Sequence, residues 1–232
     1  MIQQTPQAEI IRRQLCDSLR NECRDSRIVK FSKHENIYSG GGGVAACSIY
    51  VIESGQVKLS TLSRKGQEEC IVGINTAGDV FGELCLSGSG ERLETATAME
   101  ETELRAVPCA LFSELVRRDS LLAQGFVRYL SVRVADQQQA IAHLVTDDCE
   151  RRLGATLLEL ARKLGKRDRE SLIIEHQISQ KELSHIVGTT RSRVSEFMRR
   201  FRKLGLIERR AYDRLLVRDK DLSDYLNKLA SC

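Results

Sequence analysis

The sequence lacks any apolar run long enough to cross a membrane, which takes about 20 consecutive apolar residues. It also lacks a charged amino-terminal stretch followed by an apolar one, the pattern of a secretory signal peptide. Tryptophan is absent, yet hydrophobic residues make up 41% of the 232 residues, enough for ordinary globular cores. We therefore expect a cytoplasmic protein of one large or two modest domains, without a membrane partner.

Histidine is scarce, and cysteine is never clustered in sequence. Of four histidines only His34 lies in or near the expected β region, which disfavours a metal-dependent enzyme of the β-roll type. No Cys-x-x-Cys pair occurs, so zinc-finger spacing is absent. We expect free thiols rather than a disulfide framework, and we assign neither catalytic residues nor metal ligands. The eight cysteines are Cys16, Cys23, Cys47, Cys70, Cys85, Cys109, Cys149 and Cys232.

The charge is unevenly distributed along the chain. Residues 1–145 carry 16 basic and 18 acidic residues, whereas residues 146–232 carry 20 basic and 14 acidic residues. The net charge is therefore −2 in the first part and +6 in the second. This asymmetry is typical of a sensing module joined to a nucleic-acid-binding module.

Residues 178–204 have the pattern of a helix–turn–helix. Ser179 and Glu182 form a potential capping box, Gly188 suits a tight turn, and Thr190 suits a second N-cap. The apolar positions of the second helix recur at helical spacing and are expected to point inward: Val194, Phe197, Met198, Phe201 and Leu204. The residues expected to face DNA are Ser179, Gln180, Thr189, Thr190, Arg191, Ser192, Arg193, Ser195, Glu196 and Arg199.

The rest of the chain predicts an α+β fold. Short strands are expected at 28–31, 48–52, 57–61, 69–74, 95–98 and 102–107, which is typical of a β-sandwich, a β-roll or a jelly-roll barrel. Helices are expected at 9–24, where Ile10, Ile11, Leu15 and Leu19 share a face, and at 110–118, 121–145, 149–165 and 221–230. Gly165 to Arg169 is expected to be a charged turn, a strand follows at 172–175, and 206–209 with 215–218 predicts a hairpin wing. We place the domains at 1–120 (β-roll sensor), 121–146 (dimerisation helix) and 147–232 (winged helix).

Residues Phe81–Leu86, which we call the cassette, are followed by Arg92 within the β region. A short glycine-containing segment can direct its backbone N–H groups at an anion, and an arginine adds the charge that a phosphate prefers. Glu83 can accept a hydrogen bond from a ribose hydroxyl. The alternative is a turn between strands with a surface arginine. Cys85 lies inside the cassette and makes a thiol sensor a further alternative.

The helix at 121–145 carries apolar residues at alternating steps of three and four, which is typical of a coiled-coil seam. We expect this seam to join two chains in a parallel dimer, whereas the alternative is a helix packed on its own domain. The seam positions are Val127, Leu130, Val134, Gln137, Ile141 and Leu144.

This order of elements resembles the cyclic-AMP receptor protein and fumarate–nitrate regulator family of bacterial transcription factors, over about residues 27–218. Phe81-Gly-Glu-Leu with Arg92, and Ile186-Val-Gly-Thr-Thr-Arg-Ser-Arg-Val-Ser, carry the resemblance. It implies an effector site formed by Gly82, Glu83, Leu84, Cys85, Arg92, Leu93, Gln137 and Gln138. Leu93 stands where the family usually has Ser or Thr, Glu94 follows it, and Gln137 and Gln138 replace a Thr-Ser pair. A cyclic nucleotide is one candidate effector. An iron–sulfur cluster at Cys16 and Cys23 is a weaker one, because their spacing differs from that of the family.

The resemblance also implies a homodimer that binds a two-fold symmetric double-stranded DNA site and contacts RNA polymerase. The family usually reads bases with Arg, Glu and a second Arg. Arg191 matches the first, whereas Ser192 and Glu196 replace the other two. We therefore expect a DNA site that differs from that of the cyclic-AMP branch. The main alternative is a regulator that uses its cysteines, rather than a cyclic nucleotide, to sense redox state or to hold a metal cluster.

Overall fold

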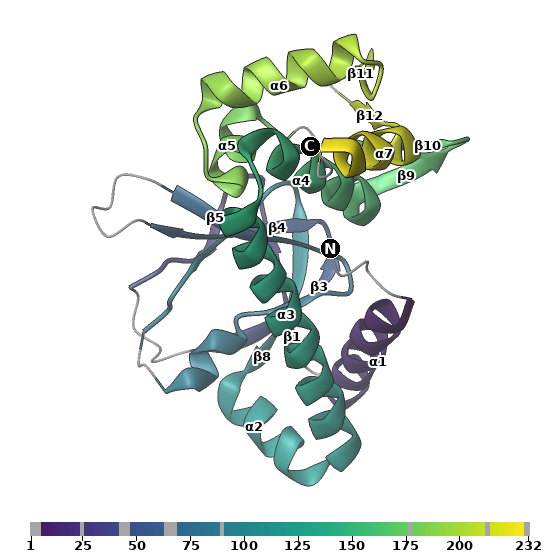
Figure 1. The fold of residues 1–232 in the computed structure, drawn as a ribbon. Helices are drawn as coiled ribbons and strands as arrows, with labels where there is room; N and C mark the ends of the chain where they lie inside the picture. The colour runs from purple at the N-terminus through teal and green to yellow at the C-terminus, as the bar shows by residue number, and fades with distance from the viewer. Residues whose placement is uncertain are drawn as a thin grey trace. The chain divides into compact units, whose positions relative to one another are not determined.

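The computed structural model describes residues 6–23, 26–41, 47–62, 69–88, 91–175, 178–211 and 214–229. The chain folds into two compact units, Ile2–Gln138 and Gln139–Cys232, and helix α3 (Ser120–Thr146) runs through the boundary. Among the described residues, the longest helices are too polar to cross a membrane. Figure 1 shows the order of the elements along the chain.

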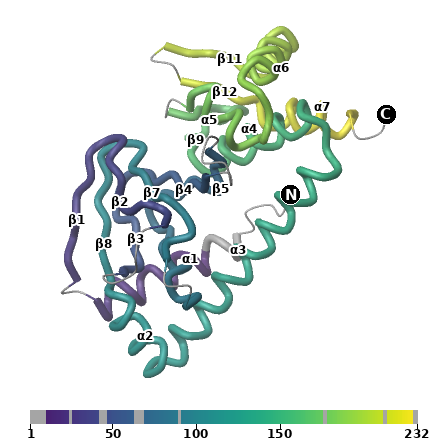
Figure 2. The backbone as a smooth tube through the Cα atoms, turned by 90° about the vertical axis from the view of Figure 1, so that its left-hand side faces the viewer, coloured from purple at the N-terminus to yellow at the C-terminus, as the bar shows by residue number. Residues whose placement is uncertain are grey.

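The first unit is built on two antiparallel sheets. One sheet has the strand order β1 (Arg27–Phe31), β8 (Thr102–Pro108), β3 (Ser48–Ser54) and β6 (Val80–Phe81). The other has the order β2 (Asn36–Tyr38), β7 (Thr95–Ala98), β4 (Gln56–Leu62) and β5 (Glu69–Thr76). Figure 2 shows β1 beside β8, which pair from Arg27 with Ala106 to Phe31 with Thr102. Both sheets contribute buried residues to one core, namely Ile52, Val57, Leu59, Phe81, Ala96 and Leu104.

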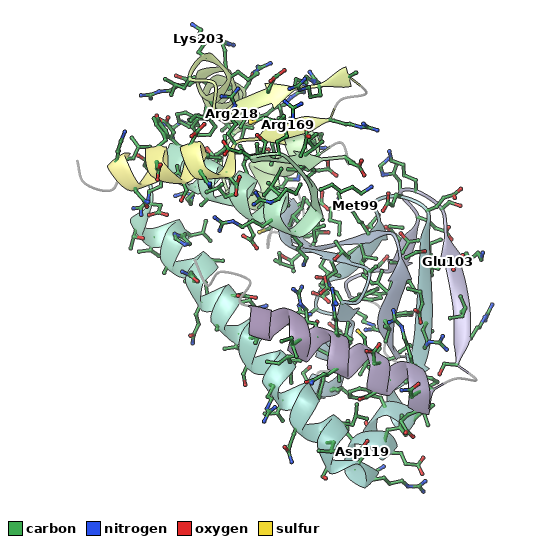
Figure 3. The ribbon with its side chains drawn as sticks, turned by 90° about the vertical axis from the view of Figure 1, so that its right-hand side faces the viewer. Met99, Glu103, Asp119, Arg169, Lys203 and Arg218 are labelled. Atoms are coloured by element: carbon green, nitrogen blue, oxygen red, sulfur yellow. A yellow bond between two sulfur atoms is a disulfide. The ribbon has the colours of Figure 1, made fainter. Side chains whose placement is uncertain are left out.

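Helices cover the outer side of the β3 sheet. Helices α1 (Pro6–Glu22), α2 (Cys109–Arg118) and α3 share a second core with β3, β6 and β8. Figure 3 shows α1 alongside the first part of α3. This core includes Leu15, Leu19, Val51, Phe112, Leu122 and Phe126. The amino-terminal half of α3 is thereby fixed to the β-roll.

The second unit is a winged helix. It contains α4 (Cys149–Leu164), α5 (Gln180–Val187), α6 (Arg191–Lys203) and α7 (Asp219–Leu229). Its sheet has the order β11 (Ile207–Arg209), β12 (Leu215–Val217), β10 (Ser171–Ile174) and β9 (Gly165–Asp168). The predicted inner face of α4 is buried throughout: Leu153, Leu157, Leu158, Leu160 and Ala161.

The structure confirms the predicted fold class and corrects several local predictions. The predicted turn at Gly165–Arg169 is largely strand β9, because Lys166, Arg167 and Asp168 pair with β10. Strands β2 and β6 were not predicted, since each spans only two or three residues. Ile10 is 53% exposed and Leu204 is 52% exposed, so neither belongs to the buried face predicted for its helix.

The expectation of free thiols throughout is also wrong, because Cys47 and Cys109 form a disulfide. These residues are separated by 62 positions in sequence, and sheet pairing of β3 with β8 brings them together. Cys16 and Cys23, the candidate iron–sulfur ligands, are buried in the helix-facing core. The thiol of Cys16 donates to the Gly78 carbonyl at 2.7 Å, and burial raises its pKa to about 12. Both features disfavour the thiolate that a cluster requires.

Candidate functional site

The helix–turn–helix is built by local hydrogen bonds that the sequence encodes. The Glu182 amide donates to Ser179 Oγ at 3.1 Å, and the Ser179 amide donates back to Glu182 Oε2 at 2.9 Å. This capping box starts α5. Gly188 ends α5 in the left-handed region at φ 67°, and its amide donates to the Ser184 carbonyl. Thr190 Oγ1 then accepts from the Arg193 amide at 3.4 Å and caps α6. The predicted turn and both caps are therefore present.

Helix α6 separates an apolar face from a basic one. Val194, Met198 and Phe201 are buried against the rest of the unit. Of the ten residues predicted to face DNA, seven are exposed: Ser179, Thr190, Arg191, Ser192, Arg193, Glu196 and Arg199. The other three, Gln180, Thr189 and Ser195, are half-buried. Lys203, labelled in Figure 3, ends the helix. The exposed residues form a surface whose side chains suit base edges and phosphates.

A depression of about 530 Å³ adjoins this surface, and its lining combines apolar side chains with basic ones from α5, α6 and the wing. Arg191, Lys181, Arg202 and Arg209 contribute to its lining. The sequence predicted a wing but assigned it no DNA contact, although Arg209 brings its positive charge to the same depression. The basic side chains among its lining residues are of the type that attracts the phosphate backbone.

Two arginines that the sequence did not single out brace the winged helix. Arg200 donates to Glu150 Oε2 at 2.8 Å, and Tyr225 donates to the other oxygen of that carboxylate at 2.6 Å. Arg152 donates to the carbonyls of Val187 at 3.1 Å and Asp147 at 2.7 Å. These contacts join α4 to α5, α6 and the end of α3. No local sequence pattern indicated them, because each joins residues from separate elements.

The second candidate site is centred on the cassette, which forms a 3-10 helix at Glu83–Ser87. Gly82 precedes it with a φ of 86°, and a Cβ atom there would lie 3.0 Å from the Ser48 carbonyl oxygen. Only glycine fits this conformation without strain. Leu84 and Cys85 are half-buried, whereas Glu83 is only 6% exposed.

Arg92 is buried and clamps the cassette to the sheet. Its guanidinium donates to the carbonyls of Gly82 and Ser48, both at 3.0 Å, and lies 4.1 Å from the ring centroid of Tyr38. Leu93, the next residue, is 53% exposed. The resemblance assigned Arg92 to a ligand phosphate, but here its guanidinium makes structural hydrogen bonds.

Two carboxylates and a second guanidinium complete a buried polar cluster. Glu83 Oε1 lies 3.1 Å from Arg133 Nη1 of α3, and Glu94 accepts from the Tyr38 hydroxyl at 2.9 Å. Burial, opposed by the Tyr38 hydrogen bond, raises the pKa of Glu94 above its usual value. Among the described residues, the buried Glu83 Oε2 has no hydrogen-bond partner. Sequence reasoning missed Arg133, whose position in the long helix gave no sign that it reaches the cassette.

Two other residues predicted for the effector site are not buried with this cluster. Gln137 and Gln138 are exposed on α3. The predicted seam residues on the same helix are also largely exposed in one chain. Val127 is 61%, Val134 51%, Ile141 60% and Leu144 52% exposed, while Leu130 packs on the helix-facing core.

Comparison with known proteins identifies both units. The family model of the cyclic nucleotide-binding domain matches residues 28–119, and that of the Crp-like helix-turn-helix domain matches residues 151–222. The CRP-like cAMP-activated global transcriptional regulator of Mycobacterium tuberculosis is 32% identical over 162 residues, which cover 68% of this chain and 70% of that protein. The chain belongs to the CRP/FNR family. It is a DNA-binding transcription regulator of that type, and its relatives are regulators rather than enzymes.

Other members of the CRP/FNR family show the same relationship. The fumarate and nitrate reduction regulatory protein of Escherichia coli K12 is 28% identical over 160 residues, covering 69% of this chain and 63% of that protein. The solved structure of a CRP-family transcriptional regulator from Thermus thermophilus superposes with a TM-score of 0.70. It is 28% identical, and the match covers 86% of this chain and 96% of that one. The fold predicted from the order of elements is thereby confirmed.

Proposed function

We propose that this regulator works as a homodimer that binds a two-fold symmetric DNA site under the control of an effector sensed in the β-roll. The main support for this proposal is the exposed basic face of α6. The N-cap of α6 and its buried apolar face hold the helix in place on the rest of the unit. In this scheme residues 1–120 sense, residues 121–146 dimerise and residues 147–232 bind DNA. RNA polymerase is the expected further partner in transcription.

The exposed apolar stripe on α3 supports the dimer. Val134, Ile141 and Leu144 are more than half exposed, although each is a large apolar residue at a seam position. Apolar side chains repeated along one helix face favour burial against a second copy of that helix. A dimer sets two α6 helices on successive major grooves, about 34 Å apart on a two-fold site.

The polar cluster bears on the type of effector. Arg92 and Arg133 are balanced by Glu83 and Glu94, so an entering anion meets two carboxylates as well as two guanidiniums. The unpartnered Glu83 Oε2 instead favours a ligand group that donates a hydrogen bond. Because Glu83 also pairs with Arg133 of α3, a ligand at this carboxylate can act on the dimer helix.

The DNA surface is tested by Arg191→Ala. If Arg191 contacts a base, its loss weakens binding to the specific site by roughly 1–3 kcal/mol and relaxes sequence preference at one position. Selection of binding sites followed by a gel-shift titration measures both effects. Arg117→Ala, an exposed arginine on α2 that donates to the Ser113 carbonyl, is the matched control and should leave DNA binding unchanged. If Arg191→Ala bound DNA with unaltered affinity and specificity, the surface that reads the bases would have to lie elsewhere on the protein.

The dimer is tested by Ile141→Asp, which places a charge in the proposed seam. Analytical ultracentrifugation should show a dimer for the parent chain and a shift toward monomer for the variant. Arg128→Ala, an exposed change on the same helix outside the seam positions, should leave the dimer intact. A monomeric parent chain at micromolar concentration would overturn the homodimer.

The ligand class is tested by calorimetric titration with cyclic AMP. Because Glu94 is buried beside Arg92 and Leu93 is exposed, we expect no micromolar binding. Micromolar binding that is lost in Arg92→Lys would show that the cluster rearranges to hold a phosphate, and would contradict this interpretation of its charge balance.

A further inference from the structure

Three cysteines from separate elements meet beside the cassette. Cys47 immediately precedes β3, Cys85 lies in the 3-10 helix of the cassette, and Cys109 is the first residue of α2. Their sulfur atoms all lie within 4.8 Å of one another, and each residue is half-buried. Cys85 Sγ is 2.6 Å from Cys109 Sγ, across 24 residues of sequence. We call this group the cysteine triad.

The backbone around the cysteine triad holds the three sulfurs in register. The Cys109 amide donates to the Cys47 carbonyl at 3.0 Å, next to the pairing of Ser48 with Pro108. The Cys85 amide donates to the Gly82 carbonyl at 3.3 Å. Arg92 donates to the carbonyls of both Gly82 and Ser48, so it fixes the cassette next to the start of β3. The convergence thus follows from hydrogen-bonded main chain on all three sides.

A disulfide accounts for only two of the three sulfurs. In the structure Cys47 and Cys109 form it, which leaves the Cys85 thiol against the bonded pair. Three convergent sulfurs are instead a ligand set for a soft metal ion, since thiolates select Zn²⁺ and Cu(I) over harder cations. Zinc–sulfur bonds of about 2.3 Å in tetrahedral geometry place sulfurs roughly 3.8 Å apart. All three sulfurs lie within 4.8 Å of one another in the disulfide form, where Cys85 Sγ and Cys109 Sγ are 2.6 Å apart, so reduction must let the sulfurs separate before the ion enters.

We propose that the reduced cysteine triad, Cys47, Cys85 and Cys109, binds one thiophilic metal ion per chain, for which Zn²⁺ is the probe. Solvent supplies the fourth ligand, because the triad is half-exposed. The ion replaces the thiol protons on binding, so affinity rises with pH.

The disulfide and the metal exclude each other. To form the disulfide, the thiols of Cys47 and Cys109 give up two protons and two electrons to a small-molecule disulfide, which leaves as two thiols. The oxidised triad then offers a single free thiol, that of Cys85. Metal binding is therefore confined to the reduced protein, and the triad responds to metal and to redox state together.

Metal binding at the triad can affect the ion pair between Glu83 and Arg133 that was proposed above to connect the effector site to α3. Cys85 lies two residues after Glu83, whose carboxylate pairs with Arg133 of α3. A metal bond to Cys85 fixes the 3-10 helix that positions this carboxylate. This consequence, unlike the metal site itself, rests on the proposed function.

The test uses the full chain, reduced with a phosphine under nitrogen and stripped with a chelator. Zn²⁺ is then titrated against a chromophoric competitor. We expect one tightly bound Zn²⁺ per chain, and a loss of affinity in Cys85→Ser of at least about 100-fold, because loss of a ligand exceeds the effect of an outer-shell change. Cys70→Ser, at an exposed free cysteine on β5, is the matched control and should bind as the parent does.

Two further measurements use the parent chain, so they test the metal site even if Cys85→Ser misfolds. Co²⁺ added to the parent chain should give intense sulfur-to-cobalt absorption, and prior oxidation by oxidised glutathione should abolish both Co²⁺ and Zn²⁺ binding. Absence of stoichiometric metal in the reduced parent chain, or metal that survives oxidation, overturns the triad site. DNA affinity is measured separately, with and without metal: an absence of DNA binding in both states would refute the proposed function and leave the metal site standing.

Discussion

The β-roll and the winged helix use the same residue types in opposite environments. In the β-roll, Arg92 and Arg133 are largely buried and bonded to carbonyls, an aromatic ring and a carboxylate. On α6, Arg191 and Arg199 are exposed on a helix whose opposite face is buried. The first pair holds parts of the protein together, whereas the second is available to a nucleic acid. Burial, rather than residue type, separates the two roles.

The cysteines show the same contrast. Cys16 is fully buried in the helix-facing core, and burial raises its pKa to about 12. Cys149 begins α4 in the winged helix, where a hydrogen bond with Thr189, together with Arg193 and Arg152, lowers its pKa below 9.0. One thiol therefore stays protonated, and the other is poised to ionise. The following predictions, in order of expected effect, test this contrast between the two regions.

The largest effect is expected in thiol reactivity. The raised pKa of Cys16 and the lowered pKa of Cys149 predict a much larger thiolate fraction at Cys149 near neutral pH. A short pulse of iodoacetamide, followed by mass spectrometry of peptides, should label Cys149 and spare Cys16. Equal rates of alkylation at Cys16 and Cys149 would show that the two thiols do not differ in ionisation as proposed.

Arg133→Ala should destabilise the protein strongly, because it leaves the buried Glu83 carboxylate without its ion pair. We expect a loss of about 3 kcal/mol in the free energy of unfolding, measured by urea denaturation. Arg199→Ala on α6 should change stability by less than about 0.5 kcal/mol while reducing the salt dependence of DNA binding by about one ion. If both arginines gave the same loss of stability, the distinction between buried and exposed arginines would fail.

Glu94→Gln should stabilise the β-roll at neutral pH by about 1 kcal/mol, since a neutral amide still accepts from Tyr38. The folded-state pKa of Glu94 is raised, so folding takes up a proton. Its ionisation therefore costs stability above the folded-state pKa, and that cost disappears as pH falls toward the unfolded value near 4.5. The variant and parent should thus converge in acid. If the difference in stability between variant and parent were the same at every pH, ionisation of Glu94 would not be its cause.

Ser179→Ala should give the smallest change, a loss of roughly 0.5–1 kcal/mol in the stability of the winged helix. The variant removes the side-chain acceptor of the capping box that starts α5. Thermal unfolding followed by circular dichroism measures it. Lys181→Ala, an exposed change one residue inside the same helix, should have no destabilising effect. A larger loss than that of Arg133→Ala would mean that exposed local contacts dominate over buried ones.

Features that depend on neighbouring residues were predicted correctly from the sequence. The caps Ser179 and Thr190, the turn at Gly188 and the buried Val194 and Phe201 were all predictable, because each depends on neighbours within a few residues. The six predicted strands likewise exist, with ends shifted by at most two residues. Leu204 was misassigned because the helix ends at Lys203, so helical spacing no longer applies to it.

The amino-acid sequence by itself determined the elements, the charged and apolar faces of the helices, and the order of modules that marks the family. Only the tertiary structure decided which charges are partners and which cysteines meet. Glu83 reaches Arg133 across 50 positions, and the cysteine triad forms because β3, the cassette and α2 converge. The physical reason is range: caps and periodicity act over one or two turns of chain, whereas ion pairs and sulfur clusters depend on sheet register and core packing between distant segments.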